Sequence, residues 1–262
     1  MVKLSACIDI LYRNLDFYDR FKAAKDSGLD AAEFWGFAGR DLGRVREECD
    51  KYGLTLAACC VSGTGEAADR FNQKKLLYRD GIEDFLEVTR QTVEAAKILN
   101  CKTFIVTVGQ ERNDATRYEQ HKNIVLALKA AAPIFEDAGL TMVVEPLNTL
   151  TDHKGYFLAS SYEAFAILEE VGSPAIKLLY DVYHQQITEG NLIPQIKKNI
   201  DLIGHFHVAD NPGRNEPGTG EINYKKIFEV IGETGYDKFV GLEYRPTMPE
   251  AETMKALLEI AK

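Results

Sequence analysis

The sequence predicts a single (β/α)8 barrel that spans all 262 residues, and three observations lead to this fold class. Short apolar runs rich in β-branched residues alternate with longer amphipathic stretches from one end of the chain to the other. The alternation repeats about eight times, which is the number of strand–helix units that closes a parallel barrel. The chain length also suits one barrel domain, with no linker or low-complexity tract to divide it.

The expected strands are apolar on both faces, as in the run from Thr141 to Val144, which suits a parallel sheet covered by helices. They are Leu4–Ile8, Ala31–Trp35, Leu54–Val61, Thr103–Val108, Thr141–Pro146, Ile176–Val182, Leu202–Val208 and Phe239–Tyr244. An open, doubly wound sheet is the alternative architecture. However, no GxGxxG or Walker-type loop follows the first strand, as a nucleotide-binding version would require.

Amphipathic segments between these strands predict the helices. They are Asp16–Ser27, Asp41–Tyr52, Asp80–Leu99, Ala115–Ala138, Ser161–Val171, Leu192–Asn199, Tyr224–Thr234 and Glu250–Ala261. Ser161 and Asn223 are the expected N-caps. The glycines expected to end helices in a left-handed conformation are Gly28, Gly53, Gly139, Gly172 and Gly235.

Two connections are longer than a simple loop needs, Ser62–Arg79 after the third strand and Asn211–Glu221 after the seventh. Both follow the carboxyl end of a strand, which is the functional face of a barrel. We therefore expect them to form lids or walls of the substrate site.

Composition limits the classes of partner. A net charge of −9 argues against nucleic acid, which is bound through clustered Lys and Arg, and favours a small soluble substrate. No apolar run approaches the roughly 20 residues of a membrane span, so a cytoplasmic protein with no membrane contact is expected. The five cysteines lack CxxC spacing, which predicts free, mostly buried thiols.

Four of the expected strands each end in a residue of a type that can bind a metal ion. The motifs are Val143-Val-Glu145-Pro, Leu179-Tyr-Asp181-Val, His205-Phe-His207-Val and Gly241-Leu-Glu243-Tyr. Burying an ionised carboxylate within an apolar strand costs roughly several kcal/mol of folding free energy unless the carboxylate is paired or coordinated. One such acid is more often satisfied by an Arg or a backbone amide than by a metal. Four on successive strands favour one shared divalent cation.

Three carboxylates and one imidazole suit Mn²⁺, Mg²⁺ or Co²⁺, with Zn²⁺ less favoured. Glu145, Asp181, His207 and Glu243 are the predicted ligands. His205 lies two residues before His207 and faces the same side of its strand, so we expect it to support the site from the core.

The motifs VVEPLN, YDVYH, GHFHVADNPGRNEPGTGEINY and GLEYRP resemble the xylose-isomerase-like barrel superfamily, and more closely the hydroxypyruvate isomerases. The resemblance covers essentially the whole chain. It implies that Glu145 and Glu243 donate and accept protons, that Asp181 completes the metal ligands, and that the protein is a homo-oligomer. Hydroxypyruvate isomerases often have an amide residue where His207 stands, whereas ketose 3-epimerases of the superfamily have His there.

Isomerisation and epimerisation by these two kinds of enzyme need the same chemistry. A metal that binds a substrate carbonyl and the neighbouring hydroxyl makes the adjoining C–H bond acidic, so that one Glu can remove the proton and the other can return it. Return to the adjacent carbon gives isomerisation, and return to the other face of the same carbon gives epimerisation.

Further residues are candidates for substrate binding. His184 is expected in the loop that leaves the sixth strand, with a solvated loop His as the alternative. Arg214 is the expected clamp for a carboxylate, oriented by Glu216, with a solvated surface Arg as the alternative. Glu33 and Trp35 are expected to add a pocket wall, although core packing explains Trp35 almost as well.

The leading hypothesis is a metal-assisted isomerase that converts hydroxypyruvate to tartronate semialdehyde (2-hydroxy-3-oxopropanoate). A ketose 3-epimerase or another small-sugar isomerase is the alternative. More distant hypotheses are an endonuclease-IV-like phosphodiesterase, which would need a trinuclear metal cluster, and a sugar-binding module without catalytic activity.

Overall fold

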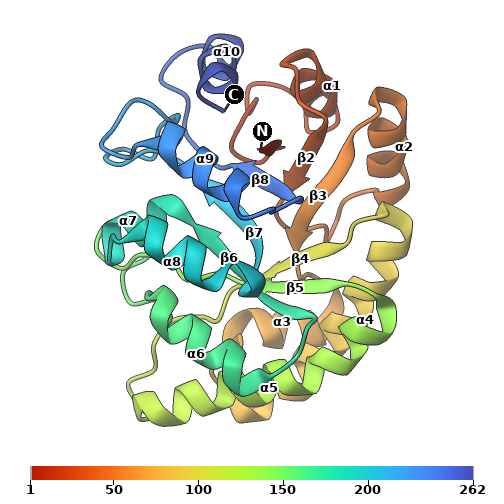
Figure 1. Ribbon diagram of the computed structural model, residues 1–262. Helices are drawn as coiled ribbons and strands as arrows, with labels where there is room; N and C mark the ends of the chain where they lie inside the picture. Colours follow the sequence, from red (N-terminus) through yellow and green to blue (C-terminus); the bar gives the residue numbers. More distant parts are fainter. Residues whose placement is uncertain (1, 262) are drawn as a thin grey trace.

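The computed structural model describes residues 2–261 and confirms the (β/α)8 barrel (Figure 1). All strand pairs are parallel and follow the order of the sequence, and the last strand pairs with the first, with Ala6 opposite Leu242. The strands are β1 (Lys3–Cys7), β2 (Ala31–Phe34), β3 (Thr55–Cys60), β4 (Thr103–Val106), β5 (Thr141–Val144), β6 (Ile176–Asp181), β7 (Ile203–Val208) and β8 (Phe239–Leu242).

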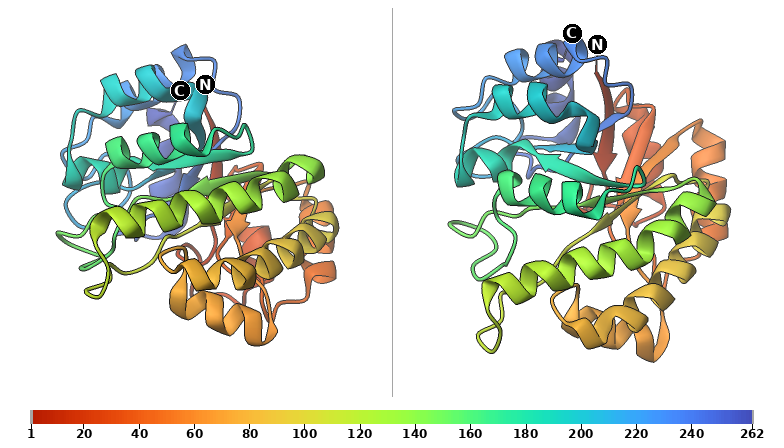
Figure 2. Two further views of the ribbon diagram at one scale, coloured as in Figure 1. Left: turned by 90° about the horizontal axis from the view of Figure 1, so that it is seen from below. Right: turned by 60° about the horizontal axis from the view of Figure 1, so that its bottom comes forward.

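Helices surround the barrel (Figure 2). The helices are α1 (Asp19–Asp26), α2 (Leu42–Tyr52), α3 (Gly65–Lys74), α4 (Ile82–Leu99), α5 (Arg117–Ala138), α6 (Ser161–Val171), α7 (Val182–Thr188), α8 (Leu192–Asn199), α9 (Tyr224–Glu233) and α10 (Glu250–Ile260), with short 3-10 turns η1 (Arg79–Gly81) and η2 (Ile200–Leu202). Helices α6 and α8 have the bounds that the sequence predicts. No helix within residues 2–261 is both long and apolar enough to cross a bilayer.

Two helices lie where the sequence predicted loops. Helix α3 occupies much of the connection Ser62–Arg79, and only Ala68 and Phe71 of its residues are buried, so its apolar face is too narrow to stand out in a polar segment. Helix α7 begins directly where β6 ends, because the Asp181 side chain accepts hydrogen bonds from the backbone N–H groups of Tyr183 and His184. The prediction that His184 lies in a loop is therefore wrong.

The helix ends largely follow the sequence. Gly53, Gly139 and Gly172 have φ angles of 63°, 63° and 69° and close α2, α5 and α6 in the left-handed conformation. Asn223 caps α9 by accepting from the N–H of Lys226. The cap of α6 is Ser160 rather than Ser161, since Ser160 accepts from the N–H of Tyr162.

The barrel interior is divided between an apolar and a polar side. Ala58, Ile105, Val143 and Leu179 form a small apolar cluster of their own. The other side holds the buried polar group Ser5, Glu33, His205 and His207. The free cysteines agree with the prediction, since all are buried except Cys60, which is partly buried and packs against the apolar cluster.

Gly241 of β8 makes room for this polar group. Its strand register places it opposite His207. A Cβ atom on Gly241 would lie 2.3 Å from Glu33 Oε1 and 2.6 Å from His207 Cδ2, and neither side chain is free to move because both are buried against other residues. Only glycine at position 241 therefore leaves room for the Glu33 and His207 side chains.

We expect Gly241→Ala to lower the free energy of unfolding by about 1–3 kcal/mol, because overpacking a filled core forces side chains from their preferred positions. Gly232→Ala in α9 is the matched control, since nothing lies within 4 Å of its added Cβ and Ala is favoured over Gly in a helix. Denaturant unfolding of both variants measures the difference. Equal stability of the two variants would contradict the steric requirement.

Candidate metal centre

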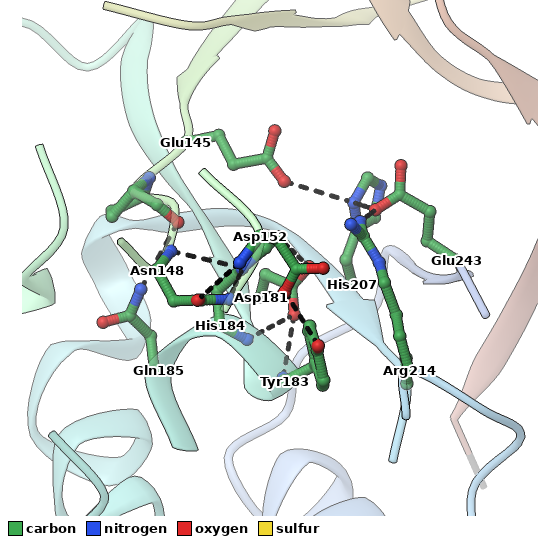
Figure 3. A network of polar contacts seen from close by, with 12 residues as sticks. Glu145, Asn148, Asp152, Asp181, Tyr183, His184, Gln185, His207, Arg214 and Glu243 are labelled. Carbon is green, nitrogen blue, oxygen red and sulfur yellow. Dashed lines mark hydrogen bonds and ion pairs between the residues drawn. The ribbon is translucent and has the colours of Figure 1, made fainter. Parts of the chain in front are cut away.

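The structure brings Glu145, Asp181, His207 and Glu243 together at the carboxyl ends of β5 to β8. One ligand atom from each lies within 4.8 Å of the others, and all four residues are buried. The register of the barrel contributes directly, because Asp181 of β6 pairs with His207 of β7. Figure 3 shows the Glu145 and Glu243 side chains reaching toward His207 from two sides.

The geometry of His207 fits a bound cation. Its Nδ1 lies 3.5 Å from Glu145 Oε1 and 3.6 Å from Glu243 Oε2, and this buried nitrogen has no hydrogen-bond partner. Burial would lower the pKa of His207, but the charges of Glu33 and Glu243 outweigh burial and raise it well above 6.5. The surrounding carboxylates thus favour positive charge at this point, which is what a divalent ion supplies.

Glu243 is held in its ionised form. Its Oε1 accepts a hydrogen bond of 2.8 Å from Trp35 Nε1, and its Oε2 forms an ion pair with Arg214. Burial would raise the pKa of Glu243, but His207 and Arg214 outweigh it and hold the pKa well below its usual range. Trp35 is 43% exposed, so core packing does not explain it, and its indole N–H contacts Glu243.

Asp181 divides its two carboxylate oxygens between structure and site. Oδ1 accepts the N–H groups of Tyr183 and His184 at 2.8 and 3.1 Å, which caps α7. Oδ2 is left to face His184 Nε2 at 3.6 Å. Burial raises the pKa of Asp181, partly countered by the charges of Arg214 and His207. An ion bound by Oδ2 would stabilise the carboxylate form that the helix cap also needs.

Glu33 connects the metal centre to the barrel interior, a role that the sequence did not reveal. Its Oε1 lies 2.7 Å from His207 Nε2, while its Oε2 lies 2.9 Å from His205 Nε2 and accepts a hydrogen bond of 2.5 Å from Ser5. Burial would raise the pKa of Glu33, but the two histidines lower it to about 2. A carboxylate on the far nitrogen of a histidine fixes the ring and turns the near nitrogen toward the metal.

His184 is fully buried and borders the site through α7. Its Nδ1 accepts from the backbone N–H of Asn148 at 3.2 Å, so the proton of the neutral ring belongs on Nε2, which has no hydrogen-bond partner. Burial, with Arg214 nearby, lowers the pKa of His184 to about 4. Nε2 is therefore a neutral donor, and Figure 3 shows the His184 side chain next to Asp181.

The loop Asn211–Glu221 is ordered by contacts that differ from the predicted pair. Glu216 does not meet Arg214 but accepts hydrogen bonds from the N–H and hydroxyl of Thr247, at 3.0 and 2.5 Å. Asp210, which the sequence did not single out, accepts from the N–H groups of Gly218 and Ile222. These contacts hold Arg214, whose φ of 58° is unusual for a residue with a side chain, against Glu243.

A cavity of about 720 Å³ opens beside the metal centre. Its wall includes Leu147 and Tyr156 from the connection after β5, and Tyr156 donates a hydrogen bond of 3.0 Å to the carbonyl oxygen of Glu145. The opposite wall comes from the connections after β3 and β4, including Lys75, Thr107 and Gly109. The cavity has the size of a typical small-molecule site.

Fold and site together define a (β/α)8-barrel enzyme with a buried cluster of acidic and imidazole ligands suited to a divalent metal at the functional face of the barrel. The chain belongs to the xylose isomerase-like TIM barrel family, whose model matches residues 21–262.

Named relatives agree with this family. A 2-oxo-tetronate isomerase of Cupriavidus necator is 34% identical and a hydroxypyruvate isomerase of Escherichia coli is 30% identical, each over 94% of both chains. A solved structure of an AP endonuclease, family 2, from Brucella melitensis superposes with a TM-score of 0.87 at 25% identity over 99% of both chains. With relatives of this kind over nearly its whole length, the chain is an isomerase.

Replacing Glu33 by Gln should weaken Mn²⁺ binding about 10- to 100-fold, because His207 loses the carboxylate that fixes its ring. Glu189→Gln is the control: this partly buried carboxylate bonds to Ser160 and Ser161 at the start of α6, away from the ligands. Calorimetric titration of metal-free protein measures both affinities. Unchanged affinity in Glu33→Gln would show that Glu33 does not orient His207.

Proposed function

We propose that the protein is a divalent-metal-dependent isomerase of a short hydroxy-keto acid, with hydroxypyruvate as substrate and tartronate semialdehyde as product. The observation that carries this proposal is the position of Glu145 and Glu243, which border Nδ1 of His207 from β5 and from β8. Two carboxylates on two sides of one metal site can remove a proton from one carbon and return a proton to its neighbour. The hydroxypyruvate isomerase relative supports the choice of substrate.

Glu145, Asp181, His207 and Glu243 would hold the metal, with Mn²⁺, Mg²⁺ or Co²⁺ best suited to three carboxylates and one imidazole. When bound, such an ion acts as a Lewis acid that polarises the substrate carbonyl. The ligands are nearly inaccessible to solvent, and exclusion of water strengthens every electrostatic interaction at the site.

The two glutamates move the protons. One glutamate, in its carboxylate form, removes a proton from C3 of hydroxypyruvate, and the other, in its carboxylic acid form, delivers a proton to C2. A proton then passes from the first glutamate to the second before the next turnover. The C3 hydroxyl gives up its proton as C3 becomes the aldehyde carbon, and the former carbonyl oxygen on C2 gains one, so atoms and charge balance. His184 Nε2, a neutral donor beside Asp181, is placed to hydrogen-bond a substrate oxygen.

Two related substrates follow from specific observations. The Cupriavidus necator relative is named for 2-oxo-tetronate, which presents the same 2-oxo acid group with one more carbon. His207 favours a ketose 3-epimerase as the second candidate, because the sequence resemblance associates a histidine at this position with that activity. In that reaction the proton returns to the same carbon.

Purified protein should convert hydroxypyruvate in the presence of Mn²⁺ and lose activity in chelator. Glu145→Gln and Glu243→Gln should each lower kcat about 10²- to 10⁴-fold, the usual contribution of a positioned acid or base. Glu136→Gln, on the exposed face of α5, is the control that keeps full activity. Bound metal is measured in each variant to separate loss of proton transfer from loss of the ion.

The same assay is run with 2-oxo-tetronate, free ketohexoses and abasic DNA. Turnover of ketohexoses alone would replace the proposal with an epimerase, and cleavage of abasic DNA would replace it with a nuclease. Binding of hydroxypyruvate without turnover under every metal condition would leave a binding module.

A further inference from the structure

Three cationic side chains line the cavity beside the metal centre, and they differ in their partners. Lys74 is 2.7 Å from Asp80, and Arg112 contacts both carboxylate oxygens of Asp114 at 2.9 Å. Lys75 instead donates to the neutral amide oxygen of Asn72 at 2.9 Å. Among the residues that the structure describes, no carboxylate lies within 4.0 Å of the Lys75 ammonium group, so its charge is not neutralised within the protein.

The Lys75 side chain is also half-buried. Burial lowers the pKa of Lys75, and its ammonium group lies 4.7 Å from the centre of the Phe71 ring. A partly desolvated cation without an acidic partner gains more from an anionic ligand than a hydrated surface lysine does.

The cavity that Lys75 lines adjoins the metal centre. Tyr156, which also lines it, donates a hydrogen bond of 3.0 Å to the carbonyl oxygen of Glu145. His153 lines it as well, and the centre of its ring lies 5.2 Å from that of His184, which borders Asp181. A ligand in this cavity therefore lies next to the predicted metal ligands.

The backbone fixes the direction of the Lys75 side chain. Lys75 ends α3 with a φ of 50° and a ψ of −140°, a conformation that residues with side chains rarely adopt. Its N–H bonds to the Phe71 carbonyl at 2.6 Å, and the next N–H bonds to the Val108 carbonyl at 3.1 Å. Gly109 admits the side chain, since a Cβ there would lie 2.8 Å from the Lys75 Cβ.

We propose that Lys75 binds the carboxylate of the substrate and so selects acidic substrates over neutral sugars. This inference rests on the proposed function, because it names the group that recognises a hydroxy-keto acid. Arg214, the cation that the sequence predicted for this task, forms an ion pair with the ligand Glu243. His153 also lines the cavity and has a ring nitrogen without a hydrogen-bond partner, which provides a second donor for the same carboxylate.

The test uses protein loaded with Mn²⁺ and two ligands that cannot be isomerised, glycerate and its neutral amide, glyceramide. Lys75→Met should weaken glycerate binding about 10- to 100-fold, the usual loss for a hydrogen bond to a charged group. Glyceramide binding should be unchanged, and Lys75→Arg should restore most of the affinity for glycerate. Calorimetry measures the affinities, with bound metal determined in every variant.

Lys74→Met is the matched control, because Lys74 lines the same cavity but pairs with Asp80, and it should bind glycerate as the parent protein does. The inference is overturned if Lys75→Met binds glycerate normally, if glycerate binds no better than glyceramide, or if Arg214→Met alone loses the preference for the anion. Since glycerate has no carbonyl, its binding is independent of turnover. A protein that binds glycerate through Lys75 but does not convert hydroxypyruvate would refute the proposed function alone.

Discussion

The mutual repulsion of buried carboxylates at one end of the barrel is the constraint on which the rest of the site depends. Glu145, Asp181 and Glu243 lie around His207 with almost no access to water, an arrangement that is costly without positive charge at its centre. Two of these carboxylates are also stabilised by contacts of their own. The N–H groups at the start of α7 stabilise Asp181, and Trp35 and Arg214 stabilise Glu243. These contacts keep Glu243 ionised and orient both carboxylates while leaving Nδ1 of His207 unpaired. The charge distribution that needs a cation therefore also shapes the site that would hold it.

Glu33 adds a further buried carboxylate inside the barrel, next to His207. This carboxylate contacts the far nitrogen of His207 and is itself held by His205 and Ser5, so the orientation of one ligand depends on residues of β1, β2 and β7. The polar group fits inside the barrel only because β8 has a glycine at position 241, and the remaining interior is filled by small and branched apolar side chains. Packing of the interior and geometry of the site therefore depend on each other. A larger side chain that fills space in the interior would displace the residues that orient His207.

Sequence patterns predicted the barrel and the four strand-end residues because both signals are local. A strand–helix alternation is visible in each segment, and a charge in an apolar run is conspicuous wherever it occurs. The errors and omissions concern partners far apart in the chain. Glu33 and His205 are separated by 172 positions, and nothing near Glu216 indicates that Thr247 is its partner. Helix α7 escaped detection because it has only 7 residues and begins directly where β6 ends, and the prediction for His184 failed with it. Lys75 was not singled out, because one lysine in a polar segment has no distinguishing pattern.

The distribution of cations around the site gives a physical basis for substrate choice. Arg214 is committed to Glu243, and its charge offsets the excess of carboxylates at the centre. A guanidinium in this position strengthens the site for any substrate that chelates a metal, whether acidic or neutral. Lys75 forms no ion pair among the described residues, so its charge is available to a ligand that enters the cavity. Selectivity requires an interaction that one substrate makes and its competitor lacks, and an unpaired cation meets this requirement where a paired one does not. Under the proposal for Lys75, the connection after β3 sets the preference between sugars and keto acids, separately from Glu145 and Glu243 at the ends of β5 and β8.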